Sequence, residues 1–172
     1  KIEVFTTRPD TIYGVSFMVL APEHPYVKEI TTQNNMTAVK NYQEKASKKS
    51  ERDRQSDVKS ISGVNTGAFA IHPLSGEKIE IWIADYVLAS YGTGAVMAVP
   101  CGDQRDYDFA KHFGIAIKNI FKDIEIEEGA HTEKIGSLIE SDFLNNLTVT
   151  EGIKKAIAVL EERGIGKGKT NY

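Results

Sequence analysis

Two short stretches of the sequence gather side chains that could position a substrate and a water molecule. The first covers residues 6–11 and reads Thr-Thr-Arg-Pro-Asp-Thr, so that hydroxyls, a guanidinium and a carboxylate lie within one turn of chain. The second covers residues 91–110 and carries charged residues directly after Pro100: Asp103, Arg105, Asp106 and Asp108. Neither stretch offers an evident covalent nucleophile, so the chemistry that they indicate is the holding of a substrate against bound water.

The 6–11 stretch follows a predicted strand over residues 1–7, in which β-branched residues recur at every second position. Pro9 restricts Arg8 to an extended conformation and removes one backbone donor. Two interpretations stay open. The stretch is either a solvated turn in which Asp10 caps a short helix, or the wall of a polar pocket whose hydroxyls face a substrate.

The 91–110 stretch reads as a glycine turn, a core strand and the start of a helix. Gly92 and Gly94 allow a tight turn or a close approach to a ligand. Residues 95–99 form an apolar run short enough for a buried strand, and Asp103 is placed to cap the helix that follows. The acids at this helix start either hold a small charged group or complement the helix dipole, and the pattern alone does not choose between them.

Other kinds of site are disfavoured by the sequence. It contains no GxSxG elbow, no Walker loop and no dinucleotide fingerprint. Cys101 is the only cysteine, which excludes an internal disulfide and disfavours a structural zinc site. With no histidine near it in sequence, Cys101 is interpreted as an inert thiol. We therefore expect no metal and no cofactor.

Composition indicates one soluble globular domain. The chain has 172 residues, 41% of them hydrophobic, and a formal net charge of −3. This charge is not that of an autonomous nucleic-acid binder. The basic residues of the 45–54 run are either a solvated face or phosphate contacts: Lys45, Lys48, Lys49, Arg52 and Arg54. With a single cysteine, an intracellular setting is the simpler expectation. The sequence has no signal peptide and no apolar run of membrane-spanning length.

The predicted elements define the fold class. Strands are expected at residues 1–7, 15–21, 95–99, 115–121 and 135–139, with a hairpin over residues 67–85. Helices are expected at residues 25–31, from Asn34 onward, after Asp103, and from the capping box at Thr148 to Arg163. Strands thus alternate with three or four helices. This pattern predicts an α+β domain, built on a mixed, largely antiparallel, barrel-like sheet with surrounding helices.

Several segments together resemble the editing domain inserted in leucyl-tRNA synthetase, a class I synthetase of the leucine/isoleucine/valine group. They are residues 6–11, 21–25, 67–73, 81–85 and the run from Ala84 to Asp106. The valyl and isoleucyl editing domains share the fold, but Tyr-Gly-Thr-Gly-Ala-Val-Met-Ala-Val-Pro at 91–100 favours the leucine enzyme. The resemblance implies a single editing domain over residues 1–172, excised from a larger synthetase that the chain re-enters near residues 170–172.

The resemblance also implies an activity: hydrolysis of tRNA for leucine that carries a wrong amino acid, by attack of water on the aminoacyl ester. A hydrophobic pocket separates amino acids that differ by one methylene by only ~1–3 kcal/mol, so a second, hydrolytic sieve is needed, and sister synthetases are the standard example. The aspartate matching Asp106 pairs with the substrate's ammonium group. The threonine matching Thr11 blocks the leucine side chain.

The remaining site positions follow from the same resemblance. Thr6 and Thr7 match residues that line the reacting ester and the terminal adenosine, which makes Thr6, Thr7 and Asp106 the expected catalytic residues. Met97 and Val99 match the pocket wall. The expected substrate-binding residues are Thr11, Arg8, Met97, Val99, Asp103 and Tyr91. No cofactor is expected in this domain, because ATP is used elsewhere in the parent synthetase.

One position departs from the family. The family usually carries histidine just before the aspartate that matches Asp103, whereas this chain has Gly102. A second function class therefore stays open, a non-catalytic or decayed module that only binds the tRNA acceptor end. The expected partners are misacylated tRNA for leucine, its terminal adenosine and the rest of the synthetase, with no membrane. The isolated domain is expected to be a monomer, and its location the cytoplasm.

Overall fold

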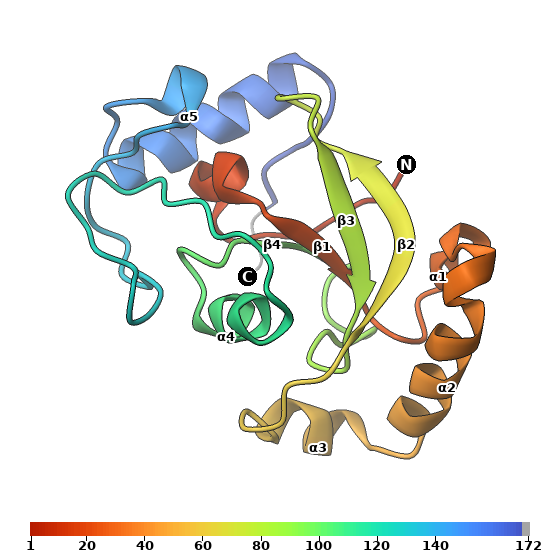
Figure 1. Cartoon of the computed structure of the whole chain (residues 1–172). Coiled ribbons are helices and arrows are strands. Elements are labelled where there is room, and N and C mark those ends of the chain that lie inside the picture. The colour runs from red at the N-terminus through yellow and green to blue at the C-terminus, as the bar shows by residue number, and fades with distance from the viewer. Residues whose placement is uncertain (170–172) are drawn as a thin grey trace.

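The structure is a computed structural model, and it describes residues 1–169 (Figure 1). Its strands are β1 (Phe17–Leu20), β2 (Val64–Ile71), β3 (Lys78–Ile83) and β4 (Ala95–Ala98). Its α-helices are α1 (Tyr26–Ile30), α2 (Met36–Ser47), α3 (Glu51–Ser56), α4 (Gln104–Phe113) and α5 (Val149–Glu162). Short 3-10 helices are η1 (Pro9–Gly14), η2 (Gln33–Asn35) and η3 (Asp142–Leu144). The expected re-entry point at residues 170–172 lies outside the described residues.

The four strands form one mixed sheet in the order β2-β3-β1-β4. β2 pairs with β3 and β1 with β4 in antiparallel fashion, whereas β1 and β3 are parallel. The predicted α+β class and the mixed, largely antiparallel sheet are therefore confirmed. The barrel-like closure is not confirmed, because within residues 1–169 the sheet has two edges, β2 and β4.

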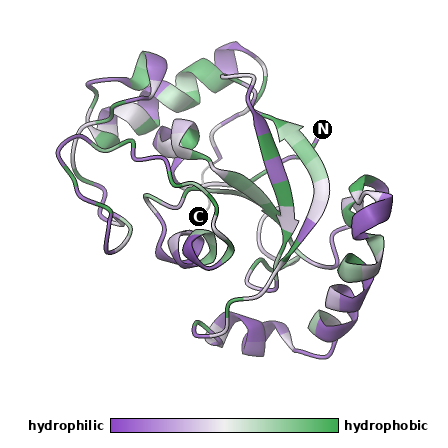
Figure 2. Cartoon of the chain, viewed as in Figure 1, coloured by the Kyte–Doolittle hydropathy of each residue, from purple (hydrophilic) through white to green (hydrophobic). Residues whose placement is uncertain are grey.

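β1 is buried on both faces and divides the core into two parts. Phe17 and Val19 pack toward α4, where the Phe17 ring stacks on Phe109 with 5.2 Å between centroids. Met18 and Leu20 point to the opposite face. Because successive strand residues face opposite sides of a sheet, a strand covered on both faces reads as a continuous apolar run, as residues 17–20 do. Figure 2 shows β1 as almost wholly hydrophobic.

The predicted hairpin is present, with the expected alternation along β3. Ile79, Ile81 and Ile83 are buried in the larger part of the core. Trp82 lies on the other face, against Phe109 and Phe113 of α4, with ring centroids 5.4 Å and 4.8 Å away. The hairpin and α4 therefore fix each other's position.

Two helix starts are capped as the sequence predicts. The Asp103 side chain accepts a hydrogen bond from the Asp106 N–H at the start of α4. Thr148 and Glu151 form the expected capping box of α5. α5 packs on η1 at Gly152, where an added Cβ would lie 2.7 Å from Leu138 and 3.3 Å from Asp10. The helix can approach this closely because Gly152 has no side chain.

Three predictions about elements are wrong. Residues 1–7 form no strand; the Glu3 carbonyl and the Phe5 ring contact Thr93 and Tyr91, in a segment where Gly92 and Gly94 adopt left-handed φ angles and offer no regular ladder to pair with. Residues 115–121 and 135–139 meet in a single isolated bridge, between Phe121 and Leu138, because Asp123 and Glu140 turn the chain at positive φ two residues after the bridged positions. The described residues also hold five α-helices rather than three or four, because α3 begins at an unpredicted Ser50 cap.

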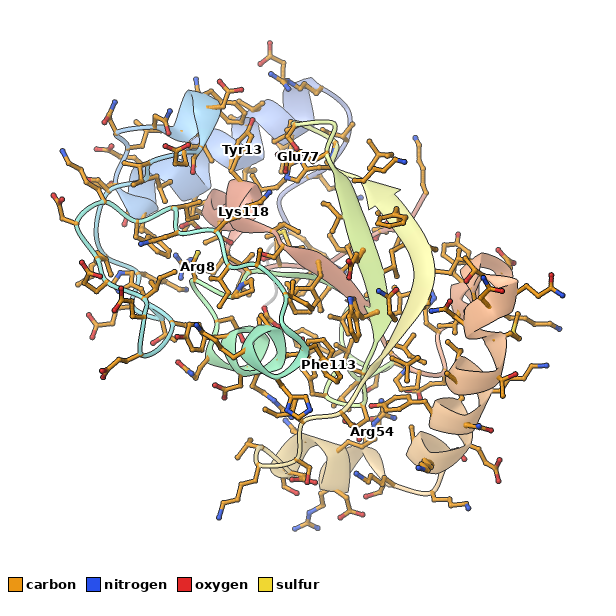
Figure 3. All side chains as sticks on the ribbon, viewed as in Figure 1. Arg8, Tyr13, Arg54, Glu77, Phe113 and Lys118 are labelled. Carbon is orange, nitrogen blue, oxygen red and sulfur yellow. The ribbon has the colours of Figure 1, made fainter. Side chains whose placement is uncertain are left out.

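The basic run is not uniformly solvated. Figure 2 shows α2 and α3 as largely hydrophilic, yet Arg54 of α3 is buried, and Figure 3 places it at the end of the sheet opposite Tyr13 and Glu77. Its guanidinium donates to both Glu23 carboxylate oxygens at 3.1 Å and to the carbonyls of Asp85 and Val87 at 2.8 and 2.9 Å. Through these hydrogen bonds Arg54 joins α3 to the turn after β1 and to the loop after β3.

Candidate active site

The threonine loop, residues 6–11, is held mainly by its own side chains. The Thr6 hydroxyl accepts from the Arg8 N–H at 2.9 Å, and the Thr11 hydroxyl donates to the Arg8 carbonyl at 2.8 Å. Arg8 forms two hydrogen bonds with the carboxylate of Asp10, at 3.0 and 2.9 Å, and Asp10 is fully buried. Of the two interpretations, the one in which Asp10 caps a helix is wrong, because Asp10 lies within η1, its carboxylate makes no cap hydrogen bond, and it pairs with Arg8 instead.

Exposure differs sharply along this loop. Thr7 is exposed and Thr6 is half-buried, whereas Thr11 is 2% exposed. The hydroxyl of Thr11 is already satisfied by the Arg8 carbonyl. Thr11 can therefore present only a small, fixed part of its β-branched side chain to a neighbouring group.

The Asp106 carboxylate lies where β4 meets α4. One oxygen accepts from the Val99 N–H at 3.0 Å, and the other accepts from the Tyr86 hydroxyl at 2.8 Å. A carboxylate has about four lone-pair sites, so each oxygen can still accept one further donor. Asp106 is 7% exposed, which leaves a narrow opening to its surface. The arrangement suits a single small cationic group.

The groups around Asp106 shift the pKa of its carboxyl. Burial, and next the negative charge of Asp103, raise the pKa of the Asp106 carboxyl to about 7. The Val99 N–H, the Tyr86 hydroxyl and the Arg105 guanidinium act in the opposite direction. Burial, and next the negative charge of Asp106, hold the pKa of Tyr86 well above its ordinary value, so the Tyr86 hydroxyl keeps its proton and remains a donor. A cation bound at Asp106 would favour the ionised carboxylate.

The fold brings the threonine loop beside the 91–106 segment. The Ser16 N–H, just after η1, donates to the Ala98 carbonyl at 3.0 Å. A Cβ built on Gly14 would lie 3.1 Å from Val99 and 3.4 Å from Cys101. The Phe5 and Tyr91 rings meet edge to face, with 5.7 Å between centroids. Within residues 1–169 no hydrogen bond joins a loop threonine to Asp106, so any group between them would have to be held from both sides.

The other predicted site residues lie along the same segment. Met97 is half-buried on β4, Val99 is buried directly after it, Asp103 is exposed at the start of α4, and Tyr91 is 54% exposed. Cys101 is buried, and burial raises the pKa of its thiol to about 11, which agrees with an inert thiol. Within residues 1–169, no cluster of three or more acidic, histidine or cysteine side chains could hold a metal ion. That no cofactor is used stays a prediction.

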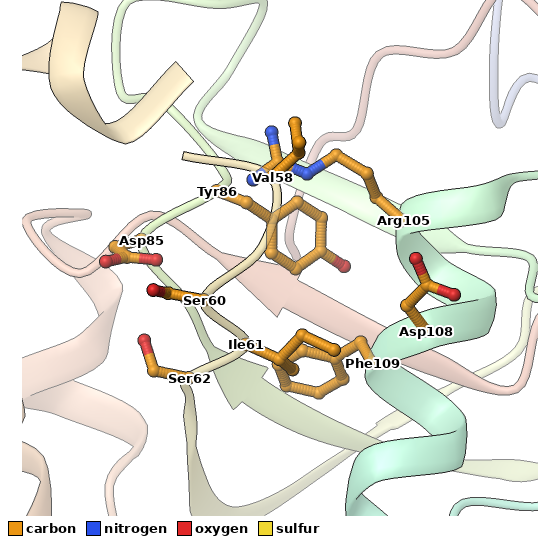
Figure 4. A pocket seen from close by; sticks show the side chains of 9 residues that line it. All are labelled: Val58, Ser60, Ile61, Ser62, Asp85, Tyr86, Arg105, Asp108 and Phe109. Carbon is orange, nitrogen blue, oxygen red and sulfur yellow. The ribbon is translucent and has the colours of Figure 1, made fainter. Parts of the chain in front are cut away.

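Two residues contact the site region in ways that sequence reasoning missed. Tyr86 reaches Asp106 across twenty positions, and His72 reaches the carbonyl of Ile12, within η1, across sixty positions. No short-range pattern reports such contacts. Tyr86 also lines a small cavity of ≈ 20 Å³ beside α4, where the Arg105 guanidinium lies 5.1 Å from its ring centroid (Figure 4). That volume is about the room one water molecule needs.

A second cavity, of ≈ 380 Å³, lies on the other side of η1. Its lining is polar and of mixed charge, and Tyr13, Glu77 and Lys118 belong to it (Figure 3). The two cavities share no residue with the threonine loop or with Asp106. Neither of these two cavities is therefore the candidate site.

Comparison with known proteins identifies the class. The family model described as "Leucyl-tRNA synthetase, editing domain" matches residues 1–161. Proteins named leucine–tRNA ligase are 57% identical in Christiangramia forsetii, over 100% of this chain, and 60% identical in Flavobacterium psychrophilum, over 99%. The chain spans 18% of the length of each.

A solved structure gives the same answer. A crystal structure of the ternary complex of LeuRS, tRNA and LeuAMS from Agrobacterium radiobacter matches with a TM-score of 0.74 and 32% identity. The match covers 99% of this chain and 18% of that one. The chain belongs to the leucyl-tRNA synthetase editing-domain family. In the part that the structure describes, no helix is both long and apolar enough to cross a membrane.

Proposed function

We propose that this chain is a hydrolytic editing domain, which removes wrong amino acids from tRNA for leucine by attack of water on the aminoacyl ester. The observation that carries the proposal is the placement of Asp106. Its buried carboxylate is oriented by two donors and retains free lone pairs, in a chain of the editing-domain family. Such a group can hold the α-ammonium of an aminoacyl ester.

The roles of the other residues follow from this anchor. Thr6 and Thr7 line the ester and the terminal adenosine, Thr11 limits the length of the amino-acid side chain, and Met97 and Val99 form the wall beside it. Arg8, Asp103 and Tyr91 contact the substrate around this centre. The catalytic set is Thr6, Thr7 and Asp106. The barrier falls chiefly because ester and water are held in place by fixed donors.

The proposal includes the setting of the domain. Residues 1–172 form one editing domain within a longer synthetase, which works in the cytoplasm. Its partners are misacylated tRNA for leucine, with its terminal adenosine, and the remainder of the synthetase. The domain alone is a monomer and uses no cofactor. The partial coverage of its relatives and the tRNA-bound structural neighbour support this setting.

Deacylation of tRNA for leucine charged with valine tests the function directly. The chain and the leucine–tRNA ligase that contains it are each incubated with this ester and with the correctly charged leucyl ester. Hydrolysis of the valyl ester with protection of the leucyl ester is expected. The proposed function is wrong if the ligase hydrolyses neither ester above the uncatalysed rate.

Gly102 favours one alternative, a module that binds the acceptor end without catalysis. The position could hold a side chain, since its φ is not left-handed and an added Cβ would lie 3.7 Å from the nearest atoms, in Phe121 and Val99. Gly102→His therefore restores the imidazole usual in the family at a position with room for its Cβ, and Gly102→Ala is the matched control. A hydrolase already competent without the imidazole should gain much less than the ~10²–10⁴-fold that a positioned acid or base contributes. Activity that appears only in Gly102→His would favour the non-catalytic module.

A further inference from the structure

His72 connects the β2–β3 turn to the loop that carries Thr11. It is the first residue after β2, and its side chain is 4% exposed. Its Nδ1 accepts from two backbone N–H groups of the turn, those of Leu74 and Ser75, each at 3.1 Å. Because two donors point at Nδ1, this nitrogen carries no proton, and the ring proton lies on Nε2.

The second ring nitrogen of His72 reaches the main chain of η1, next to Thr11. Nε2 lies 2.8 Å from the carbonyl oxygen of Ile12, which can only accept, so the Nε2–H donates to it. Ile12 directly follows Thr11 within η1. The Tyr13 ring, one residue further, stacks on His72 with 5.7 Å between centroids and 27° between planes. The imidazole therefore contacts two consecutive residues of the turn beside Thr11.

η1 depends on contacts of this kind. A 3-10 helix of six residues has few internal hydrogen bonds, and their geometry is poor. Within residues 1–169, His72 supplies the only side-chain hydrogen bond that reaches the main chain of η1 from a distant part of the chain. Other restraints on η1 are local or are packing contacts: the Arg8–Asp10 pair, the Thr11 hydroxyl on the Arg8 carbonyl, the close approach of α5 at Gly152 and of Val99 at Gly14, and the contacts of the Tyr13 side chain with Asp142 and Phe143.

We propose that His72 is a positioning residue for specificity: through the Ile12 carbonyl it fixes η1, and with it the place of the Thr11 side chain that excludes leucine. This inference rests on the proposed editing function. Thr11 can exclude the leucine side chain only if Thr11 itself stays in place. A displacement of roughly a few tenths of an ångström would already reduce the clash with the additional carbon of leucine. His72 is thus expected to affect the protection of leucine more than the hydrolysis of shorter esters.

A matched pair of variants separates the two ring nitrogens. The Gln side chain can place an N–H near Nε2, so His72→Gln keeps a donor for the Ile12 carbonyl. The Asn side chain can place an acceptor near Nδ1, so His72→Asn keeps the turn contacts but does not reach Ile12. The rates measured are deacylation of valine-charged and leucine-charged tRNA for leucine by the ligase that contains each variant. Thermal unfolding of each variant accompanies the rates.

The valine-to-leucine rate ratio is the readout that a merely structural role would not move. His72→Asn is expected to lower this ratio by about tenfold, the effect of one lost hydrogen bond on the wall, by raising hydrolysis of the leucyl ester. His72→Gln should stay within about threefold of wild type. An unchanged ratio in His72→Asn, with active wild type, overturns the positioning role alone. If wild type hydrolyses neither ester, the editing function fails and the positioning role with it.

A measurement on the wild-type chain tests the geometry even if both variants fail to fold. The nitrogen-15 shifts of the His72 ring report which nitrogen carries the proton. Protonated Nε2 with unprotonated Nδ1 is expected, together with a scalar coupling from Nε2–H to the Ile12 carbonyl. The opposite form, or no coupling, overturns the proposal.

Discussion

The threonine loop and the start of α4 hold their polar groups in different ways. Around the loop, the contacts of Thr6, Arg8, Asp10 and Thr11 span at most three positions in sequence, and the distant contact at His72 acts on the main chain. Asp106 is oriented by Val99 and Tyr86, seven and twenty positions away, and its own N–H is capped by Asp103. A local loop can shift as one piece, whereas a carboxylate held by a strand and a distant tyrosine is fixed by the whole sheet. The loop therefore needs a distant contact such as that of His72 to act as a rigid specificity wall, whereas the sheet already holds the anchor.

Replacement of Asp106, the proposed anchor of the substrate's ammonium group, should lower the deacylation rate more than any other change. Asp106→Ala deletes the proposed partner of the substrate's ammonium, and loss of a buried charge contact costs about 2–5 kcal/mol, or roughly 30-fold to several thousand-fold in the rate. Deacylation of valine-charged tRNA for leucine by the intact ligase measures it, with leucylation expected to be nearly unchanged. Asp108→Ala, on the same helix but bonded only to Gln104 in the described chain, is the control. Editing at a near wild-type rate in Asp106→Ala would remove Asp106 from the site.

Substitutions of Thr11 should change which aminoacyl esters are hydrolysed rather than abolish hydrolysis as such. Thr11→Ala should open the pocket and raise hydrolysis of leucine-charged tRNA by about 10- to 100-fold, the worth of about one methylene. Thr11→Phe should fill it and block every substrate. Thr11→Val keeps the shape but removes the hydroxyl that donates to Arg8. If Thr11→Val loses hydrolysis of the valyl ester while leucine stays protected, the hydroxyl acts in catalysis and the exclusion role is wrong.

The pH dependence of editing should follow the charge on Asp106. Because only the carboxylate binds an ammonium and the pKa of Asp106 is raised to about 7, kcat/KM should rise with pH up to about pH 7. Tyr86→Phe removes a donor to the carboxylate, so its pKa should rise and the profile should shift to higher pH. Asp103→Asn removes the neighbouring negative charge but keeps the helix cap, so the profile should shift to lower pH. Shifts in the same direction for both variants would contradict this account.

The same carboxyl affects stability with a definite sign. The pKa of Asp106 is higher in the folded chain than the value near 3.9 expected when it is unfolded, so the folded state binds the proton more strongly. Its contribution is fully present below about pH 4 and is lost as the pH rises through about 7. Urea unfolding at several pH values should show a smaller decline over this interval in Asp106→Asn than in wild type.

The smallest effect is expected from the basic run, which belongs to neither region. Neutralising Lys48, Lys49 and Arg52 together should weaken tRNA use by about threefold or less, and only at low salt. Arg54 has to be tested apart from them, because its guanidinium is buried against Glu23. Arg54→Met should lower the free energy of unfolding by about 2–4 kcal/mol with little change in editing per folded molecule. A complete loss of editing in the triple variant at physiological salt would contradict this ranking.

Local patterns in the sequence were sufficient for much of the fold. The alternation along β3, the apolar runs of β1 and β4, and the caps at Asp103 and Thr148 each depend on residues within a few positions of one another. The family could be recognised from the sequence for the same reason, since its motifs are contiguous. That the threonine loop and Asp106 belong to one site is a prediction that rests on the same motifs.

Only the tertiary structure decided which polar groups are paired and which remain free. Composition grouped Arg54 with solvated lysines, but the fold buries it against Glu23 and two carbonyls. The sequence left open that Asp10 caps a helix, whereas in the structure Arg8 donates to both of its carboxylate oxygens. Tyr86 and His72 reach Asp106 and η1 from positions far away in sequence. Burial and hydrogen bonding depend on which distant segments meet, and no spacing along the chain records that.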